Sequence, residues 1–183
     1  GVNRRGELGL ERRDNFLLPE KIPQLVNIVS MGCGRNFSAV VNTRGELLCF
    51  GLIEIITNQT EPYTIKFPDE SIHIVSVSCG NYHIIALDNK GYLWGIGYNR
   101  FGQLGLGDIE ERKYPEKLNL SDVLFFTSGA DGNIVKTKDG IYVFGKLVRG
   151  ESITTTLQTI EYETIPNKLV NELNHIIGMP PNY

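Results

Sequence analysis

Blocks of apolar and polar residues recur three times along the chain in the same order. Each block begins with a β-branched or apolar run that leads into a Cys-Gly or Ser-Gly step. A short turn, an apolar run, a polar turn ending in glycine and a second apolar run follow. The opening runs are IVSM (28–31), IVSVS (74–78) and VLFFT (123–127), and the polar turns are NTRG (42–45), DNKG (88–91) and TKDG (137–140).

Two apolar runs joined by a short polar turn that ends in glycine are typical of a β-hairpin, because glycine supplies the positive φ that such turns need. The pattern therefore predicts strands over 28–33, 38–42, 47–51, 74–79, 83–88, 92–97, 123–128, 133–137 and 141–145. No window of the chain before residue 160 carries a helical period. The tail 166–177 could form a short helix, but its Pro-x-Lys-Leu pattern repeats that of two earlier segments, and we predict a strand.

The chain is internally repetitive. GVNRRGELGL (1–10) matches GYNRFGQLGL (97–106) at seven of ten positions. The segment that closes each hairpin ends on a glycine, at Gly51, Gly97 and Gly145. This spacing divides one domain, 1–183, into units of approximately 1–51, 52–97, 98–145 and an incomplete 146–183.

All-β repeats of about 40–50 residues with four short strands each are typical of β-propeller blades. The segment VSVSCGNYHIIALDNKGYLWGIGYNRFGQLGLGD (75–108) resembles the repeat of the regulator of chromosome condensation family. The resemblance implies an all-β fold of four-stranded antiparallel blades, seven in a complete ring. On this count the chain holds about three to four blades. We expect it either to be part of a longer propeller or to be completed by another chain, with self-association through open blade edges.

The resemblance also assigns structural repeat positions, namely Gly34, Gly80, His83, Gly91, Trp94, Gly97, Gly129 and Gly140. Phe37 and Gly132 stand where His83 stands in the other copies, so the histidines form no array, and a structural hydrogen bond is favoured over catalysis. The glycine-rich loop 95–108 lacks the following helix that a phosphate site requires, and it is expected to connect strands. We interpret 107–117 as a solvated mixed-charge loop, and Trp94 and Leu104 as core residues.

The turns between the glycine and the histidine position are the best candidates for partner binding. In exchange-factor members of the resembled family, acidic side chains in these turns face a small GTPase. The corresponding residues here are Arg35, Asn36, Asn81, Tyr82 and Asp131, of which only Asp131 is acidic. An ordinary capped turn is the alternative interpretation.

Composition narrows the classes of partner. A net charge of −3 and a pI near 5.7 argue against nucleic acid as the main partner. Three cysteines without a Cys-x-x-Cys pair fit neither a disulfide framework nor a zinc site, so we expect no metal, no cofactor and an intracellular location, cytoplasmic or nuclear. No apolar run is long enough to span a membrane.

These observations favour a protein–protein interaction module without covalent chemistry of its own. The alternative is a guanine-nucleotide exchange factor for a Ran-like small GTPase. Chromatin binding, which the family name suggests, is opposed by the negative net charge.

Overall fold

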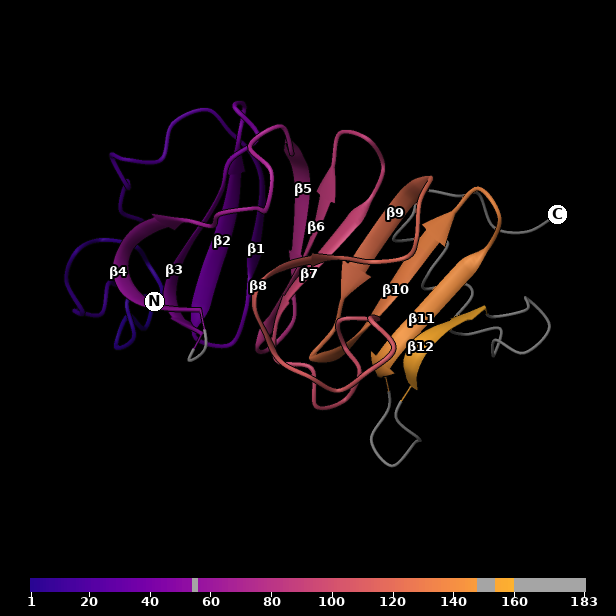
Figure 1. The fold of residues 1–183 in the computed structure, drawn as a ribbon. Helices are drawn as coiled ribbons and strands as arrows, with labels where there is room; N and C mark the ends of the chain where they lie inside the picture. The colour runs from indigo at the N-terminus through magenta and orange to yellow at the C-terminus, as the bar shows by residue number, and fades with distance from the viewer. Residues whose placement is uncertain (54–55, 148–153, 160–183) are drawn as a thin grey trace, which may run out of the picture.

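The computed structural model describes residues 1–53, 56–147 and 154–159. Within these residues the chain forms three four-stranded sheets that stand side by side, and no helix is present (Figure 1). The first sheet holds β1 (Ile28–Cys33), β2 (Phe37–Asn42), β3 (Leu47–Ile53) and β4 (Thr57–Thr64). The second holds β5 (Ile74–Cys79), β6 (His83–Asp88), β7 (Leu93–Gly97) and β8 (Arg112–Lys117). The third holds β9 (Val123–Ser128), β10 (Asp131–Thr137), β11 (Ile141–Lys146) and β12 (Thr154–Thr159).

Each sheet is an antiparallel meander in which every strand pairs with the strand before it in the chain. Neighbouring sheets meet through their first two strands: β5 contacts β1 and β2, and β9 contacts β5 and β6. We call the boundary between the first and second sheets the first seam, and that between the second and third sheets the second seam. The predicted all-β fold of four-stranded antiparallel blades is confirmed.

All nine predicted strands are present, with ends that differ from the prediction by at most two residues. The sequence pattern did not locate the fourth strand of any sheet. Residues 112–117 were predicted as part of a solvated loop, and this was wrong, because they form β8. The error has a physical reason: β8 is an outer edge strand, and edge strands carry charges and proline that look like a loop. The predicted tail strand, 166–177, lies outside the described residues.

Alternate residues of the second sheet face opposite seams, as the two-residue period of a strand requires. From β6, Ile84 and Ala86 belong to the apolar cluster of the first seam, whereas Ile85 belongs to that of the second. In β7, Trp94 faces the first seam and Leu93 the second. Burial on both faces explains why these strands are almost continuously apolar.

A glycine near the end of the third strand of each sheet lets the chain pass close to the preceding turn. At Gly97, φ is +114°, and a Cβ would lie 2.5 Å from the carbonyl oxygen of Tyr82. Gly51 and Gly145 have the same left-handed backbone and approach an equivalent turn carbonyl. These contacts explain the glycine that closes each sequence repeat. Because the fourth strand follows this glycine, the repeat unit and the sheet are out of phase.

The two copies of the glycine-rich loop pack on the next sheet in the same way. In the loop 97–106, a Cβ on Gly105 would lie 2.9 Å from the ring of Phe144 in β11. In the loop 1–10, Gly9 lies equally close to Phe50 in β3. Each loop thus packs against the third strand of the sheet that follows it.

Candidate functional site

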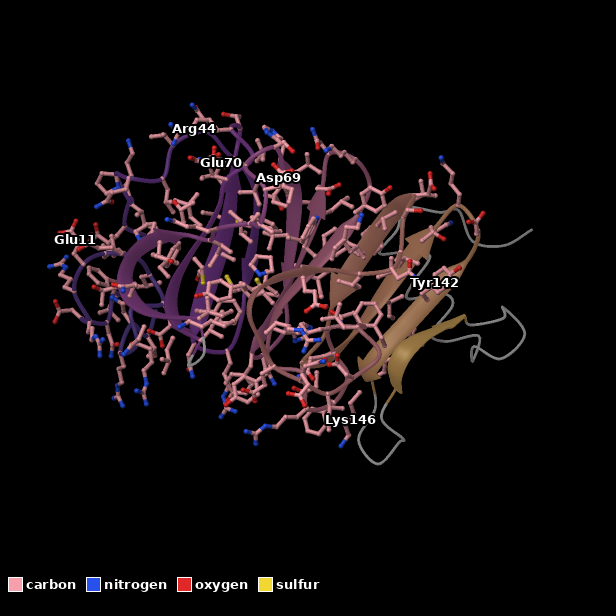
Figure 2. All side chains as sticks on the ribbon, in the orientation of Figure 1. Glu11, Arg44, Asp69, Glu70, Tyr142 and Lys146 are labelled. Carbon is pink, nitrogen blue, oxygen red and sulfur yellow. The ribbon has the colours of Figure 1, made fainter. Side chains whose placement is uncertain are left out.

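The three turns between the first and second strands of each sheet line up at one end of the sheets. We call this end, formed by residues 34–36, 80–82 and 129–131, the turn end, and the opposite end, with the polar hairpin turns, the hairpin end. Figure 2 shows the two ends on opposite sides of the molecule, with Lys146 at the turn end and Arg44 at the hairpin end. Backbone hydrogen bonds link the turns: Arg35 N–H donates to the Asn81 carbonyl at 3.1 Å, and Asn81 N–H to the Ala130 carbonyl at 2.8 Å. The turns therefore form one continuous surface.

Each turn is closed by one backbone hydrogen bond. Gly80 N–H donates to the His83 carbonyl at 2.9 Å, and Gly34 makes the same bond to Phe37. The ring of His83 lies over Gly80, where a Cβ would come within 2.0 Å of the imidazole. Gly129 begins the third turn, and the fourth residue of that turn, Gly132, has no side chain to cover it. Only glycine can occupy the first position under an aromatic ring.

Four side chains from the first two sheets form a continuous row on the turn end. Arg35 Nη1 donates to the Tyr82 hydroxyl at 2.7 Å, and the guanidinium lies 5.6 Å from the Tyr82 ring centre. The Tyr82 and Tyr98 rings follow at 5.4 Å with a 42° tilt. Arg100 lies over the other end, 5.4 Å from the Tyr98 ring centre. We call Arg35, Tyr82, Tyr98 and Arg100 the arginine–tyrosine ladder.

The predicted partner-binding residues have different surroundings in the structure. Arg35, Asn81 and Tyr82 are brought together by the hydrogen bonds above. Asn36 accepts a hydrogen bond from Leu52 N–H at 2.7 Å through its carbonyl oxygen. Asp131 is the first residue of β10 on the third sheet, opposite Lys146 in the β10–β11 register.

Sequence reasoning missed Tyr98 and Arg100, which were treated as parts of a structural loop. A signal existed, because the tripeptide Tyr98-Asn99-Arg100 has the counterpart Val2-Asn3-Arg4 in the first loop. Asn99 is fully buried and its Oδ1 accepts from Leu104 N–H at 2.8 Å. An arginine next to this buried anchor must therefore point outward.

His83 lies in the second seam rather than on the surface. Its Nε2 is 2.9 Å from Asn133 Oδ1, and Asn133 Nδ2 donates to the Gln103 carbonyl at 2.7 Å. Because the amide nitrogen is used there, Oδ1 must accept, so His83 carries its proton on Nε2. Burial lowers the pKa of His83 to about 4 and keeps it neutral. Nδ1 has no partner among the described residues.

Trp94 and Asp88 organise the hairpin end of the second sheet. Trp94 Nε1 donates to Asp88 Oδ2 at 2.9 Å. The other carboxylate oxygen accepts from Lys90 N–H and Tyr92 N–H at 2.8 and 3.0 Å. Gly91 completes this turn with a φ of +84°. Gly140 donates to Thr137 Oγ1 in the corresponding turn of the third sheet.

The titratable and thiol groups of the described residues form no candidate metal site. Residues 1–53, 56–147 and 154–159 contain no group of three or more histidine, cysteine or acidic side chains placed to hold a metal ion. Cys33, Cys49 and Cys79 are free thiols, and burial raises the pKa of Cys49 to about 12. No helix among these residues could cross a membrane.

The sequence patterns of known families match this chain over residues 1–41, 74–103 and 90–133, each time as "Regulator of chromosome condensation (RCC1) repeat". The chain belongs to this repeat family. The ladder therefore stands on RCC1 blades, with Arg35 and Tyr82 in the turns that begin their second strands. The matched stretch 90–133 also includes the loop that carries Tyr98 and Arg100.

The relatives are large proteins of different kinds. Over 150 residues the chain is 29% identical to the ultraviolet-B receptor UVR8 of Arabidopsis thaliana, covering 76% of this chain and 32% of the relative. Over 142 residues it is 30% identical to the probable E3 ubiquitin-protein ligase HERC4 of Homo sapiens, covering 70% of this chain and 13% of the relative. This RCC1 chain thus spans a third or less of these proteins.

Solved structures show the same fold. Prp20p from Saccharomyces cerevisiae matches with a TM-score of 0.73 at 18% identity, covering 90% of this chain and 46% of that chain. Human WBSCR16 matches with a TM-score of 0.72 at 17% identity, covering 88% and 46%. The RCC1 propeller fold is therefore shared, and the chain spans less than half of each structure.

Proposed function

We propose that this RCC1-repeat chain is a protein-binding module without covalent chemistry of its own, and that its partner docks on the turn end. The observation that carries the proposal is the arginine–tyrosine ladder. Tyrosine and arginine are the side chains that most often anchor protein interfaces. Here two of each are joined on one surface built by two sheets.

The position of the ladder suits recognition. Its members lie on turns and a loop held by rigid sheets, which is where scaffold proteins place binding residues. Arg35 and Arg100 are exposed, and Tyr82 and Tyr98 are half-buried. Aromatic side chains that are fixed before binding lose little conformational entropy when a partner covers them.

The relatives are consistent with a module that serves larger proteins. UVR8 is named as a receptor and HERC4 as a probable ubiquitin ligase, and this chain matches only a part of each. The structure of Prp20p was described together with the binding properties of that protein to Gsp1p and histones. Free thiols at Cys33, Cys49 and Cys79 fit the reducing, intracellular location that we propose.

The test compares the two ends of the same sheets. The turn-end variant is Arg35→Ala/Tyr82→Ala, and the matched control at the hairpin end is Arg44→Ala/Tyr92→Ala. Each protein is used as bait for cross-linking and quantitative mass spectrometry. We expect specific partners to be recovered at least fivefold less with the turn-end variant and unchanged with the control. Partners that depend only on the hairpin-end residues would refute the proposed face.

The exchange-factor alternative rests on a different residue, Asp131, the acidic side chain of the third turn. A carboxylate is needed to displace magnesium or to compete for a phosphate-binding lysine. Release of labelled GDP from a Ran-like GTPase, measured with the chain and with Asp131→Ala, tests it. Acceleration that the substitution abolishes would favour exchange. No acceleration of GDP release at micromolar protein would refute the exchange-factor alternative and leave the binding module as the remaining proposal.

A further inference from the structure

We infer that the arginine–tyrosine ladder selects its partner through carboxylates, and that it takes an extended acidic peptide segment. This inference rests on the proposed function and adds the chemistry of the partner. It follows from three features of the ladder. Arg35 has no ion pair among the described residues, its guanidinium is fixed in position, and the rings of Tyr82 and Tyr98 are already in contact with the neighbouring members of the ladder.

Arg35 is exposed, and none of the ion pairs within the described residues includes it. Two other arginines are neutralised by carboxylates a few residues away in the chain. Arg44 at the hairpin end pairs with Glu46 at 2.7 Å, and Arg112 pairs with Asp108 at 2.6 Å. The turn end therefore presents a guanidinium whose positive charge awaits an external anion.

The guanidinium of Arg35 is held in place before any ligand arrives. Its Nη1 donates to the Tyr82 hydroxyl, and its central carbon lies 5.6 Å from the Tyr82 ring centre. A free arginine side chain loses rotamer entropy when it is fixed, so contacts that hold it beforehand favour binding. The remaining N–H groups form the planar fork that matches a carboxylate.

Arg100 provides a second anion-binding point at the other end of the ladder. Its Nε pairs with Glu111 at 3.1 Å, which leaves the terminal nitrogens on an exposed side chain. Three steps of 5.6, 5.4 and 5.4 Å separate the two guanidiniums. An extended chain advances about 3.3 Å per residue, so two carboxylates no more than about five residues apart would reach both arginines.

The tyrosine contacts disfavour nucleic acid as the occupant. Single strands bind by stacking bases on open aromatic faces and by many phosphate contacts. Here Tyr82 is engaged by Arg35 and Tyr98, and Tyr98 is also engaged by Arg100. Arg35, which has no ion pair among the described residues, and Arg100, which is already paired with Glu111, offer few phosphate contacts, and beside occupied rings they suit a short acidic peptide.

The test uses a ten-residue peptide of alternating Glu and Gly, with the Gln and Gly peptide as its neutral counterpart. Binding to the full chain is followed by NMR of ring-labelled tyrosine, with Tyr82 and Tyr98 assigned through their Tyr→Phe variants. We expect the Glu peptide to shift both signals and to bind at least tenfold more tightly than the Gln peptide. Arg35→Gln should weaken binding at least fivefold. The matched Arg44→Gln should change it less than twofold.

Several results would overturn the inference. These are equal affinity for the Gln peptide, no binding, shifts confined to tyrosines outside the ladder, and an equal loss from Arg44→Gln. Tighter binding of a ten-residue uridine oligonucleotide than of the Glu peptide would assign the surface to nucleic acid instead. Folding is not at issue, because Arg35 is exposed, and the unperturbed signals of the other tyrosines verify it.

Failure of this inference can be told apart from failure of the proposed function. The cross-linking comparison is repeated with Arg35→Gln/Arg100→Gln, which keeps both tyrosines. If partners are lost with Arg35→Ala/Tyr82→Ala but retained with this variant, the turn end is the protein-binding face and the inference of an acidic ligand is wrong. Partners retained with both variants would remove both proposals.

Discussion

The two seams between the sheets use different chemistry at the same repeat position. In the second seam His83 of β6 is hydrogen-bonded to Asn133 of β10, which in turn reaches the Gln103 carbonyl. At the equivalent positions of the first seam stand Phe37 and Ile84, and both belong to one buried apolar cluster. Position in the blade is shared, but the polarity of the pair is not.

The comparison teaches that in these two seams the position is filled by a matched pair of side chains and not by one residue type. A buried histidine needs a partner for its N–H, and asparagine supplies it. A buried phenylalanine needs only apolar neighbours. The seams also differ in the connection between the third and fourth strands of the preceding sheet. In the second sheet this connection includes the long loop 97–106, whose Gln103 carbonyl accepts a hydrogen bond from Asn133. In the first sheet only residues 54–56 separate β3 from β4. The polar pair thus occurs in the seam where the long loop supplies a carbonyl that Asn133 can donate to.

Asn133→Ile should break the second seam most severely. It leaves the His83 Nε2–H and the Gln103 carbonyl buried without partners, so we expect the free energy of unfolding to fall by about 3 kcal/mol. Urea denaturation measures the loss. The matched change Ile84→Val in the first seam should lower the free energy of unfolding by about 1 kcal/mol. A loss below about 1 kcal/mol for Asn133→Ile would show that the hydrogen-bonded pair adds little.

Converting the second seam into the first is the direct test of pairing. His83→Phe/Asn133→Ile should be more stable than the sum of its single variants by about 2 kcal/mol, because no buried N–H is left without an acceptor. It should remain about 1 kcal/mol below the original protein, since the Gln103 carbonyl still lacks its donor. A double-variant cycle measured by urea denaturation gives the coupling. Simple additivity would mean that the two side chains act independently.

The seams should also differ in their response to acid. The pKa of His83 is about 4 in the folded protein against an ordinary value of 6.5, so the unfolded chain binds a proton first as the pH falls. Stability from this group is complete above pH 6.5 and is lost towards pH 4. Between pH 7.5 and 5 we expect a loss of about 2 kcal/mol. Thermal melts of His83→Phe/Asn133→Ile should lack this part of the pH dependence, and equal profiles would contradict it.

The smallest expected effects come from a feature that both seams share. A serine hydroxyl of one sheet accepts a backbone N–H of the next: Ser30 from Val77 at 3.1 Å in the first seam, and Ser78 from Ser128 at 2.9 Å in the second. Ser30→Ala and Ser78→Ala should each lower the free energy of unfolding by about 1 kcal/mol, without pH dependence. Urea denaturation at two pH values checks both. Losses that differ by more than about 1 kcal/mol would mean that the seams differ here too.

Local pattern was enough to predict the strands that face the core. Alternation and hairpin glycines placed β6 at its observed residues and β7 to within one residue of its start, because both depend on neighbours within a few residues. The same reasoning failed for β8, whose Lys113, Tyr114 and Glu116 are exposed. An outer strand buries too few side chains to leave an alternating pattern.

Half of the ladder was also within reach of the sequence. Repeat alignment placed Arg35 and Tyr82 in equivalent turns, one unit apart. It did not reveal that the two touch, or that Tyr98 and Arg100 continue the row. The contact between Arg35 and Tyr82 depends on how the first sheet is rotated against the second, and the contacts of Tyr98 and Arg100 depend on how the loop after β7 folds back onto the turn of its own sheet. No local pattern records either arrangement.

The sequence by itself determined the repeat, the antiparallel hairpins and the glycines, because backbone sterics and period-two burial act over short stretches of chain. Only the tertiary structure decided which residues meet across a seam. His83 finds Asn133 fifty residues later, and Arg35 meets Tyr82 forty-seven residues later. Such pairs are selected by packing two finished sheets against each other, where a buried polar group must find its partner and an exposed charge can remain free for a ligand.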